Sequence, residues 1–185
     1  LTGSLIMSGT KSRSKDQLDK EIDFIGASLS ASATNISLST LTKHLDKGLA
    51  LMSDLTMNAS FPESEFKRVV DQFKSGLVSL KSEGGAMANN ATVKVNFPNH
   101  PYGEVMTFTS LAAISLADVQ SYYKENFTPQ GAFLVIVGDI NRTQAEKYID
   151  TYFGSWTGGV PSQPQFTDPQ KSDGNQVYFV NKPGA

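Results

Sequence analysis

Residues 28–34 alternate between apolar or small side chains and hydroxyl side chains with a period of two. Leu29 and two alanines fall on one face of this segment, a pattern typical of a strand that is buried on one side only. The small side chains of that face predict that a helix packs closely on the sheet. After a turn at Asn35, the same pattern runs over residues 36–42, so we predict two antiparallel strands.

Most of the remaining chain carries apolar residues at helical spacing. Ser14 and Gln17 form a capping box ahead of Leu18, Ile22 and Ile25, which recur on one helix face. The same reasoning predicts helices over residues 14–25, 43–57, 62–82, 86–95, 115–126 and 141–153. A short apolar helix is also predicted at the start of the chain.

Residues 132–137 form an unbroken apolar run, which predicts a strand that is buried on both faces. Grouped strands and grouped helices are typical of an α+β fold, with helices covering a mostly antiparallel sheet. Three strands make a thin sheet. We therefore expect further strands upstream of Leu1 to complete it, or a neighbouring copy of the chain to do so.

The composition excludes several classes of protein. Sixteen basic and eighteen acidic residues give a net charge of -2, whereas a nucleic-acid-binding surface usually needs a basic excess. The absence of cysteine excludes disulfides and thiolate zinc sites. No apolar run approaches the about 18 residues of a membrane helix, so no membrane span is expected. For the compartment we favour the bacterial periplasm or cytoplasm.

Several short segments occur in an order and at a spacing that resemble a known family. They are Met7-Ser-Gly-Thr10, Leu18-Asp-Lys-Glu-Ile22 leading to Ile25-Gly-Ala-Ser-Leu-Ser-Ala-Ser-Ala33, Asn58-Ala-Ser-Phe61, His100-Pro-Tyr-Gly103, Tyr123-Lys-Glu-Asn126 and Val135-Ile-Val-Gly-Asp139. This set resembles the N-terminal-type half of the insulinase/pitrilysin family of zinc peptidases, which includes the mitochondrial processing peptidase. The match covers residues 1–156 and implies a metallopeptidase-like half-domain of the processing-peptidase type.

In active members of that family, the helix before the Gly-Thr exit carries the motif His-X-X-Glu-His. The two histidines bind zinc and the glutamate acts as base for the zinc-bound water. The resemblance places the second histidine at Ser4, the catalytic glutamate at Gly3 and the distal glutamate ligand near Gly76. The first histidine would precede Leu1. We therefore expect no catalytic residue, no metal site and no cofactor in this chain, with Gly3, Ser4 and Gly76 as degenerate positions.

The two histidines of the chain, His44 and His100, lie far apart and lack the spacing of metal ligands. For His44, which begins a helix, we predict an exposed polar side chain. For His100, which lies in a turn-rich loop, we predict a structural hydrogen bond within the turn.

The chain divides into three segments by composition and resemblance. Residues 1–156 are predicted to form the peptidase-like domain. Residues 157–175 are polar and contain three prolines, which predicts a linker. Residues 176–185 resemble the opening strand of a following homologous domain. The chain begins within an apolar stretch, which we interpret as part of a longer protein.

The resemblance implies a catalytically inactive domain that pairs with a zinc-bearing sister domain or subunit. Such a domain contributes to a chamber that binds unfolded peptides, and an exposed sheet edge would bind an extended peptide by strand addition. One alternative is a purely structural subunit, because the core proteins of the mitochondrial respiratory complex resemble this family. Another is that the chain is part of an active zinc endopeptidase whose catalytic motif lies outside residues 1–185.

Overall fold

The computed structural model describes residues 1–161, 164–169, 174 and 176–182. The chain forms two compact units. The first comprises Leu1–Val69 with Ser115–Ser162, and the second comprises Val70–Ile114 with Gln163–Ala185. The long helix α4 (Glu63–Leu80) begins in the first unit and ends in the second.

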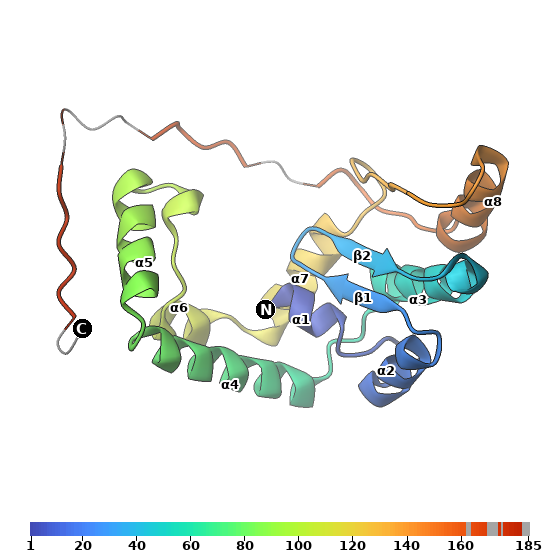
Figure 1. Ribbon diagram of the computed structural model, residues 1–185, viewed down its shortest axis with the longest axis horizontal. Coiled ribbons are helices and arrows are strands. Elements are labelled where there is room, and N and C mark those ends of the chain that lie inside the picture. The colour runs from blue at the N-terminus through green and yellow to red at the C-terminus, as the bar shows by residue number, and fades with distance from the viewer. Residues whose placement is uncertain (162–163, 170–173, 175, 183–185) are drawn as a thin grey trace. The chain divides into compact units, whose positions relative to one another are not determined.

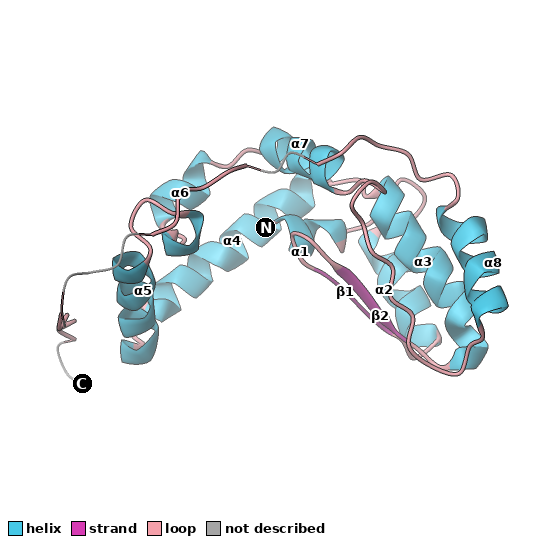
Figure 2. Cartoon of the chain, turned by 90° about the horizontal axis from the view of Figure 1, so that it is seen from above, coloured by secondary structure: helices cyan, strands magenta, loops and turns pink. Residues whose placement is uncertain are grey.

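The first unit combines a β-hairpin with helices that pack against it (Figure 1). Its elements are α1 (Thr2–Ile6), α2 (Lys15–Phe24), β1 (Ser28–Ala31), β2 (Ile36–Ser39), the 3-10 turn η1 (Thr42–His44), α3 (Leu45–Asn58), α7 (Leu116–Asn126) and α8 (Arg142–Phe153). α1 contacts β1, and α3 contacts β2, α2 and α8. The same hairpin and helices are seen from above in Figure 2.

The two strands pair antiparallel, with Leu29 opposite Leu38 and Ala31 opposite Ile36. Their exposed and half-buried residues alternate, as the period of two predicted. The core beneath them includes Leu5, which is fully buried. The α+β fold class, with helices against a small antiparallel sheet, is confirmed.

The second unit contains α5 (Gly84–Asn96), the 3-10 turn η2 (Pro101–Gly103) and α6 (Phe108–Ala113), together with the C-terminal half of α4. α6 was not predicted from the sequence. It is only six residues long, and its capping box joins Thr107 to Ser110 instead of to a glutamate or glutamine. α5 begins at Gly84, two residues before the predicted start at residue 86.

The predicted strands at residues 28–34 and 36–42 are each shorter than expected. The Ser32 hydroxyl accepts hydrogen bonds from the backbone N–H groups of Thr34 and Asn35, at 3.2 and 3.0 Å. A serine that bonds to the local backbone in this way diverts the chain from the strand ladder. β2 ends at Ser39, and η1 begins three residues later at Thr42.

The prediction of a strand buried on both faces at residues 132–137 is wrong. Phe133 is 94% exposed and Val137 is 92% exposed. Within the described residues, the segment pairs with no strand. Its composition indicates a strand, but a strand requires a partner whose location the segment itself does not specify.

The structure describes only part of residues 157–185, to which the predictions for the C-terminal end of the chain refer. In the predicted linker 157–175, residues 162–163, 170–173 and 175 lie outside the described residues, as do residues 183–185. Residues 176–182 join no sheet in the described part of the chain, and the expectation that residues 176–185 open a following homologous domain stays a prediction. None of the helices in the described ranges has the length and apolar character needed to cross a membrane.

Candidate functional site

After α1 ends at Ile6, the chain leaves the helix through a tight exit at Gly9 and Thr10. Gly9 has a φ of +120°, a conformation that L side chains rarely adopt, and a Cβ there would lie 2.9 Å from the Arg13 carbonyl oxygen. Thr10 forms an isolated β-bridge with Ala59, and Gly9 forms one with Ser14. The exit is therefore fixed against the end of α3 and the start of α2.

Gly3 lies in α1 and is buried against β1. A Cβ on Gly3 would lie 2.5 Å from the carbonyl oxygen of Ala31 and 2.6 Å from the Cα of Ser32. These are backbone atoms, which cannot move aside as a flexible side chain can. The close packing of a helix on the sheet, predicted from small residues, is thus present and depends on a glycine.

The other two positions that the resemblance assigns to the zinc site, Ser4 and Gly76, are exposed. Ser4 adjoins Gly3 in α1, in the first unit. Gly76 lies in the part of α4 that belongs to the second unit, and nothing lies within 4 Å of where its Cβ would be. It lines an open groove of about 840 Å³ together with Phe73, Leu77 and Met106.

These residues do not fit a zinc ion. Gly3 and Gly76 have no side chain, and Ser4 offers only a hydroxyl. Within the described residues, no group of three or more histidine, cysteine, aspartate or glutamate side chains is placed to hold a metal. A catalytic zinc site usually takes three protein ligands.

The two histidines serve other purposes. The His100 Nδ1 accepts a hydrogen bond from the Tyr102 backbone N–H at 3.1 Å, which confirms the predicted structural bond in the turn. The His100 ring also contacts the rings of Phe97 and Tyr102. His44 precedes α3 and is half-buried instead of exposed.

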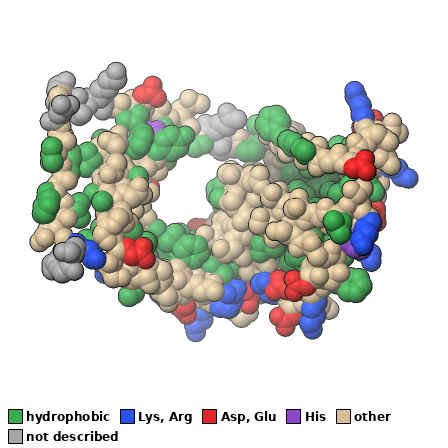
Figure 3. All heavy atoms as spheres, in the orientation of Figure 1, with side chains coloured by type: hydrophobic (Ala, Val, Ile, Leu, Met, Phe, Trp, Pro, Cys, Tyr) green, Lys and Arg blue, Asp and Glu red, His purple; other side chains and the backbone are tan. Residues whose placement is uncertain are grey.

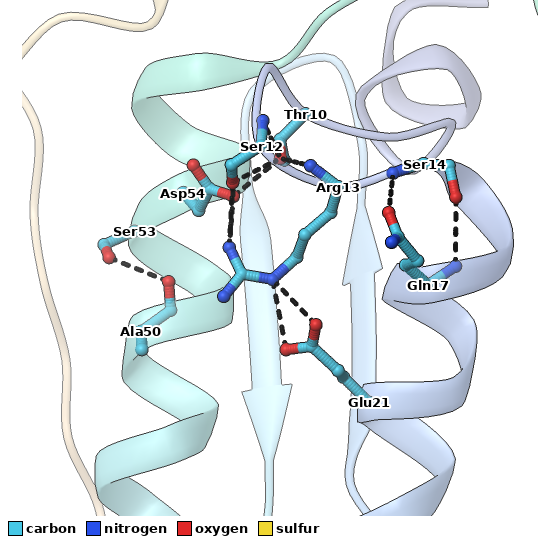
Figure 4. Close-up of polar contacts among 9 residues, drawn as sticks. All are labelled: Thr10, Ser12, Arg13, Ser14, Gln17, Glu21, Ala50, Ser53 and Asp54. Carbon is cyan, nitrogen blue, oxygen red and sulfur yellow. Dashed lines mark hydrogen bonds and ion pairs between the residues drawn. The ribbon is translucent and has the colours of Figure 1, made fainter.

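The most connected polar cluster of the first unit surrounds Asp54 of α3 (Figure 4). The Asp54 Oδ2 accepts hydrogen bonds from the Thr10 hydroxyl at 2.6 Å and the Ser12 hydroxyl at 2.8 Å. Arg13 donates to the same oxygen at 2.7 Å and pairs with Glu21 of α2 at 3.1 Å. The cluster thereby joins the α1 exit loop to both α3 and α2.

The electrostatics of the cluster favour an ionised Asp54. Burial acts to raise the pKa of its carboxyl, but the hydrogen bonds that the carboxylate accepts outweigh burial and lower the pKa below its ordinary value. An additional bond comes from the Asn58 amide, which donates to the Asp54 Oδ1 at 3.0 Å. The pairing with Asp54 and Glu21 is also consistent with the raised pKa of Arg13, although burial opposes that rise.

The surface beside this cluster is an open pocket of about 470 Å³. Its lining includes the hydroxyls of Ser8, Ser12 and Ser60 and the cationic side chains of Lys11 and Arg13. No histidine is among the lining residues, so the pocket lacks the histidine base of a Ser-His-Asp triad. The arrangement holds the loop that follows α1 in place.

Sequence reasoning missed the Asp54 cluster. Thr10 and Asp54 are 44 residues apart, and no local motif connects them. The Gly9-Thr10 exit is part of the resemblance to the family. Only the folded chain shows that the Thr10 hydroxyl donates a hydrogen bond to Asp54 of α3.

Two family models match the chain. Residues 1–104 match the model of the insulinase family, peptidase family M16, and residues 113–185 match the peptidase M16 inactive domain. The first match alone covers more than half of the chain. The chain therefore belongs to the insulinase family.

Similar proteins include a zinc protease and a subunit of the mitochondrial cytochrome b-c1 complex. The mitochondrial cytochrome b-c1 complex subunit 1 of Homo sapiens is 23% identical over 181 residues, which are 94% of this chain and 38% of that protein. A zinc protease of Rickettsia bellii, not otherwise characterised, is 22% identical over 180 residues, covering 94% of this chain and 43% of that protein.

Among solved structures, a peptidase M16 inactive domain from Pseudomonas fluorescens has the same fold. It superposes with a TM-score of 0.80 at 18% sequence identity, over 91% of this chain and 43% of that chain. This chain spans less than half the length of each of these three relatives.

Proposed function

We propose that this chain is a catalytically inactive domain of an insulinase-family protein. It pairs with a zinc-bearing sister domain or subunit and contributes to the chamber that binds unfolded peptides. The observation that carries the proposal is the packing of Gly3, because a side chain there, where the resemblance places the family's catalytic glutamate, would have no space. Ser4 and Gly76, which the resemblance places at the positions of two zinc ligands, carry no imidazole, carboxylate or thiolate of the kind that zinc prefers.

The inactivity is tested directly by metal analysis and a peptidase assay. Dialysed protein is expected to contain no stoichiometric zinc and to leave an unstructured peptide intact. One zinc per chain would contradict the proposal. Hydrolysis that a chelator abolishes would contradict it as well, because it would require a donor set elsewhere in the chain.

The peptide-binding role needs a separate measurement. A fluorescein-labelled unstructured peptide is expected to show a saturable rise in anisotropy with the chain, without cleavage. The absence of any binding would favour the second candidate, a purely structural subunit. The similarity to the human cytochrome b-c1 complex subunit 1 favours that candidate.

A third candidate is part of an active zinc endopeptidase whose motif lies outside residues 1–185. The similarity to a Rickettsia bellii zinc protease favours it. A longer polypeptide that carries this chain and binds one zinc, while the chain alone binds none, would support it.

We also propose the domain division at residues 157–175, with a further homologous domain from residue 176. The described residues of 157–169 contain neither helix nor strand, which supports a linker there. Limited proteolysis is expected to cleave first within this segment, and initial cleavage inside residues 1–156 would contradict the division.

A further inference from the structure

The turn that follows α5 in the second unit carries a cluster of aromatic side chains, Phe97, His100 and Tyr102, which we call the η2 platform. The rings of Phe97 and Tyr102 meet edge to face with centroids 5.7 Å apart, and the His100 ring lies 4.8 Å from that of Tyr102. Figure 3 shows hydrophobic side chains gathered over the part of the molecule that contains α5. Tyr102 is 72% exposed, so the platform is open to a further side chain.

The backbone of the turn fixes the η2 platform. A Cβ on Gly103 would lie 1.9 Å from the carbonyl oxygen of Phe97, so the turn packs directly on the end of α5. The hydrogen bond from the Tyr102 N–H to the His100 Nδ1, at 3.1 Å, closes the turn from within. A side chain that docks on these rings therefore meets a surface that is already ordered, which lowers the cost of binding.

Phe166 lies on this platform. Its ring meets the His100 ring edge to face, with centroids 5.6 Å apart and an angle of 64° between the ring planes. Both residues belong to the second unit. Phe166 is the one aromatic residue of the sequence between Trp156 and Tyr178. The proposed linker thus carries a single aromatic side chain, and that side chain contacts the second unit.

The start of the linker is held separately, within the first unit. The Trp156 Nε1 donates a hydrogen bond to the carbonyl oxygen of Phe127 at 3.3 Å. Two residues later, a Cβ on Gly158 would lie 2.8 Å from the Cβ of Thr128, so the chain there runs in close contact with the end of α7. The contact of Phe166 is therefore a second and independent attachment of the same segment.

We infer that Phe166 docks on the η2 platform as an anchor that holds the linker on the second unit. The inference rests on the linker proposed at residues 157–175. Pro164 and Pro169 fix φ on either side of Phe166, so fewer backbone conformations are lost when the ring docks. The second unit then sets the direction in which the chain leaves the anchor.

The strength of the anchor is measured by cleavage at Phe166 itself. Chymotrypsin has a hydrophobic pocket for the side chain before the cleaved bond, so it cleaves after Phe166 only while that ring is off the platform. When docking is fast relative to cleavage, the rate follows the undocked population. An aromatic pair of this geometry changes such an equilibrium by about two- to twelvefold.

His100→Asn removes the ring under Phe166 and keeps an acceptor for the Tyr102 N–H, because an asparagine side chain bonds to the backbone two residues on. Cleavage after Phe166 is expected to quicken by about two- to twelvefold. Cleavage after Tyr178 is the internal control, since Tyr178 is 58% exposed and Phe166 is 54% exposed. An unchanged ratio of the two rates, measured by mass spectrometry, would overturn the proposal.

The contact is also observed without a protease, from the proton on the Cε1 of His100. The chain has only two histidines, so its two imidazole signals are assigned by one substitution. Phe166→Leu lies outside the turn, keeps an apolar side chain and removes the ring current that shifts this proton. The His100 signal is expected to move, while that of His44, in the first unit, stays in place.

The two measurements separate the anchor from the domain division on which it rests. An unmoved His100 signal in Phe166→Leu would overturn the anchor and leave the division standing. Initial cleavage inside residues 1–156 would contradict the division, whereas a shifted His100 signal in the same protein would still support the contact of Phe166 with the η2 platform.

Discussion

The hydroxyl of Tyr123 in α7 donates a hydrogen bond to the carbonyl oxygen of Thr56 in α3 at 2.7 Å, across 67 residues of sequence. Thr56 lies in the last turn of α3, where helix carbonyls lack intrahelical partners. The same hydroxyl accepts a 3.3 Å bond from the Ala59 N–H. One side chain therefore ends α3 and joins it to α7.

Replacing Tyr123 with phenylalanine is expected to lower the free energy of unfolding by about 1–3 kcal/mol, because a partly buried carbonyl and N–H lose their partner. The ring itself would remain against Phe61, whose centroid lies 5.0 Å away. Chemical denaturation measures the loss. Tyr122→Phe is the control, since the Tyr122 side chain makes no hydrogen bond within the described residues. An equal loss in both variants would refute the specific role of the Tyr123 hydroxyl.

Two tyrosines are expected to limit stability at alkaline pH. Burial raises the pKa of Tyr123 from 10.0 to about 12, and the hydrogen bond to Asp46 raises the pKa of Tyr152 to about 12. A raised pKa means that the folded state favours the protonated phenol. The resulting stability is complete below pH 10 and is lost as the pH rises from about 10 towards 12.

The measurement is the free energy of unfolding against pH, with phenolate absorbance recorded in parallel. Tyr123→Phe is expected to flatten the decline above pH 10. Tyr152→Phe should flatten it less, since Tyr152 lies near the surface and its interaction with Asp46 is screened by water. If the free energy of unfolding of Tyr123→Phe declines above pH 10 as steeply as that of the unmodified chain, this prediction is wrong.

Local signals in the sequence predicted the local structure well. The capping box between Ser14 and Gln17 is present, with bonds of 2.9 and 3.3 Å, and α2 begins at Lys15 as expected. The alternation at residues 28–34 predicted the strand and its half-buried face, because the period of two is a property of the backbone. These features need only neighbouring residues.

Features that depend on distant residues were not predictable. The composition of residues 132–137 indicates a strand, but whether a partner strand lies beside it is decided outside the segment. The Thr10–Asp54 bond likewise joins residues 44 positions apart. The resemblance marked Gly3 as a degenerate position, but only the fold reveals that β1 fills the space of its side chain.

Asp54→Asn is expected to destabilise the first unit by about 1–3 kcal/mol at neutral pH, because Arg13 loses a charged partner in a half-buried cluster. The lowered pKa of Asp54 gives a pH dependence with a definite sign. Its contribution is present above the ordinary value of 3.8 and is lost as the pH falls below it. The stability difference between the two proteins should therefore shrink in acid.

The matched control for Asp54 is Asp23→Asn. Asp23 is exposed, and its side chain makes no hydrogen bond within the described residues. Its replacement should leave stability within about 0.5 kcal/mol. A difference for Asp54→Asn that persists undiminished in acid would argue against the ionised cluster.

Gly3 and Gly76 are both helical glycines, at positions that the resemblance assigns to the zinc site, yet alanine is expected to act on them in opposite directions. At Gly76, where a Cβ has open space, alanine should stabilise by up to about 1 kcal/mol through helix propensity. At Gly3, a Cβ would meet backbone of β1 at 2.5 Å, so alanine should destabilise by about 1–3 kcal/mol or more as overpacking does.

The same contrast decides whether the family's zinc motif can be restored by substitution. Gly76→Glu is expected to fold, whereas Gly3→Glu is expected to unfold the first unit or to separate α1 from β1. Thermal unfolding and near-ultraviolet circular dichroism of the two variants measure the difference. If Gly3→Glu folds with unchanged stability, α1 can shift on β1, and the steric basis for inactivity fails. If it unfolds while Gly76→Glu does not, the fold itself closes the position that the resemblance gives to the catalytic glutamate, which supports the proposed inactivity.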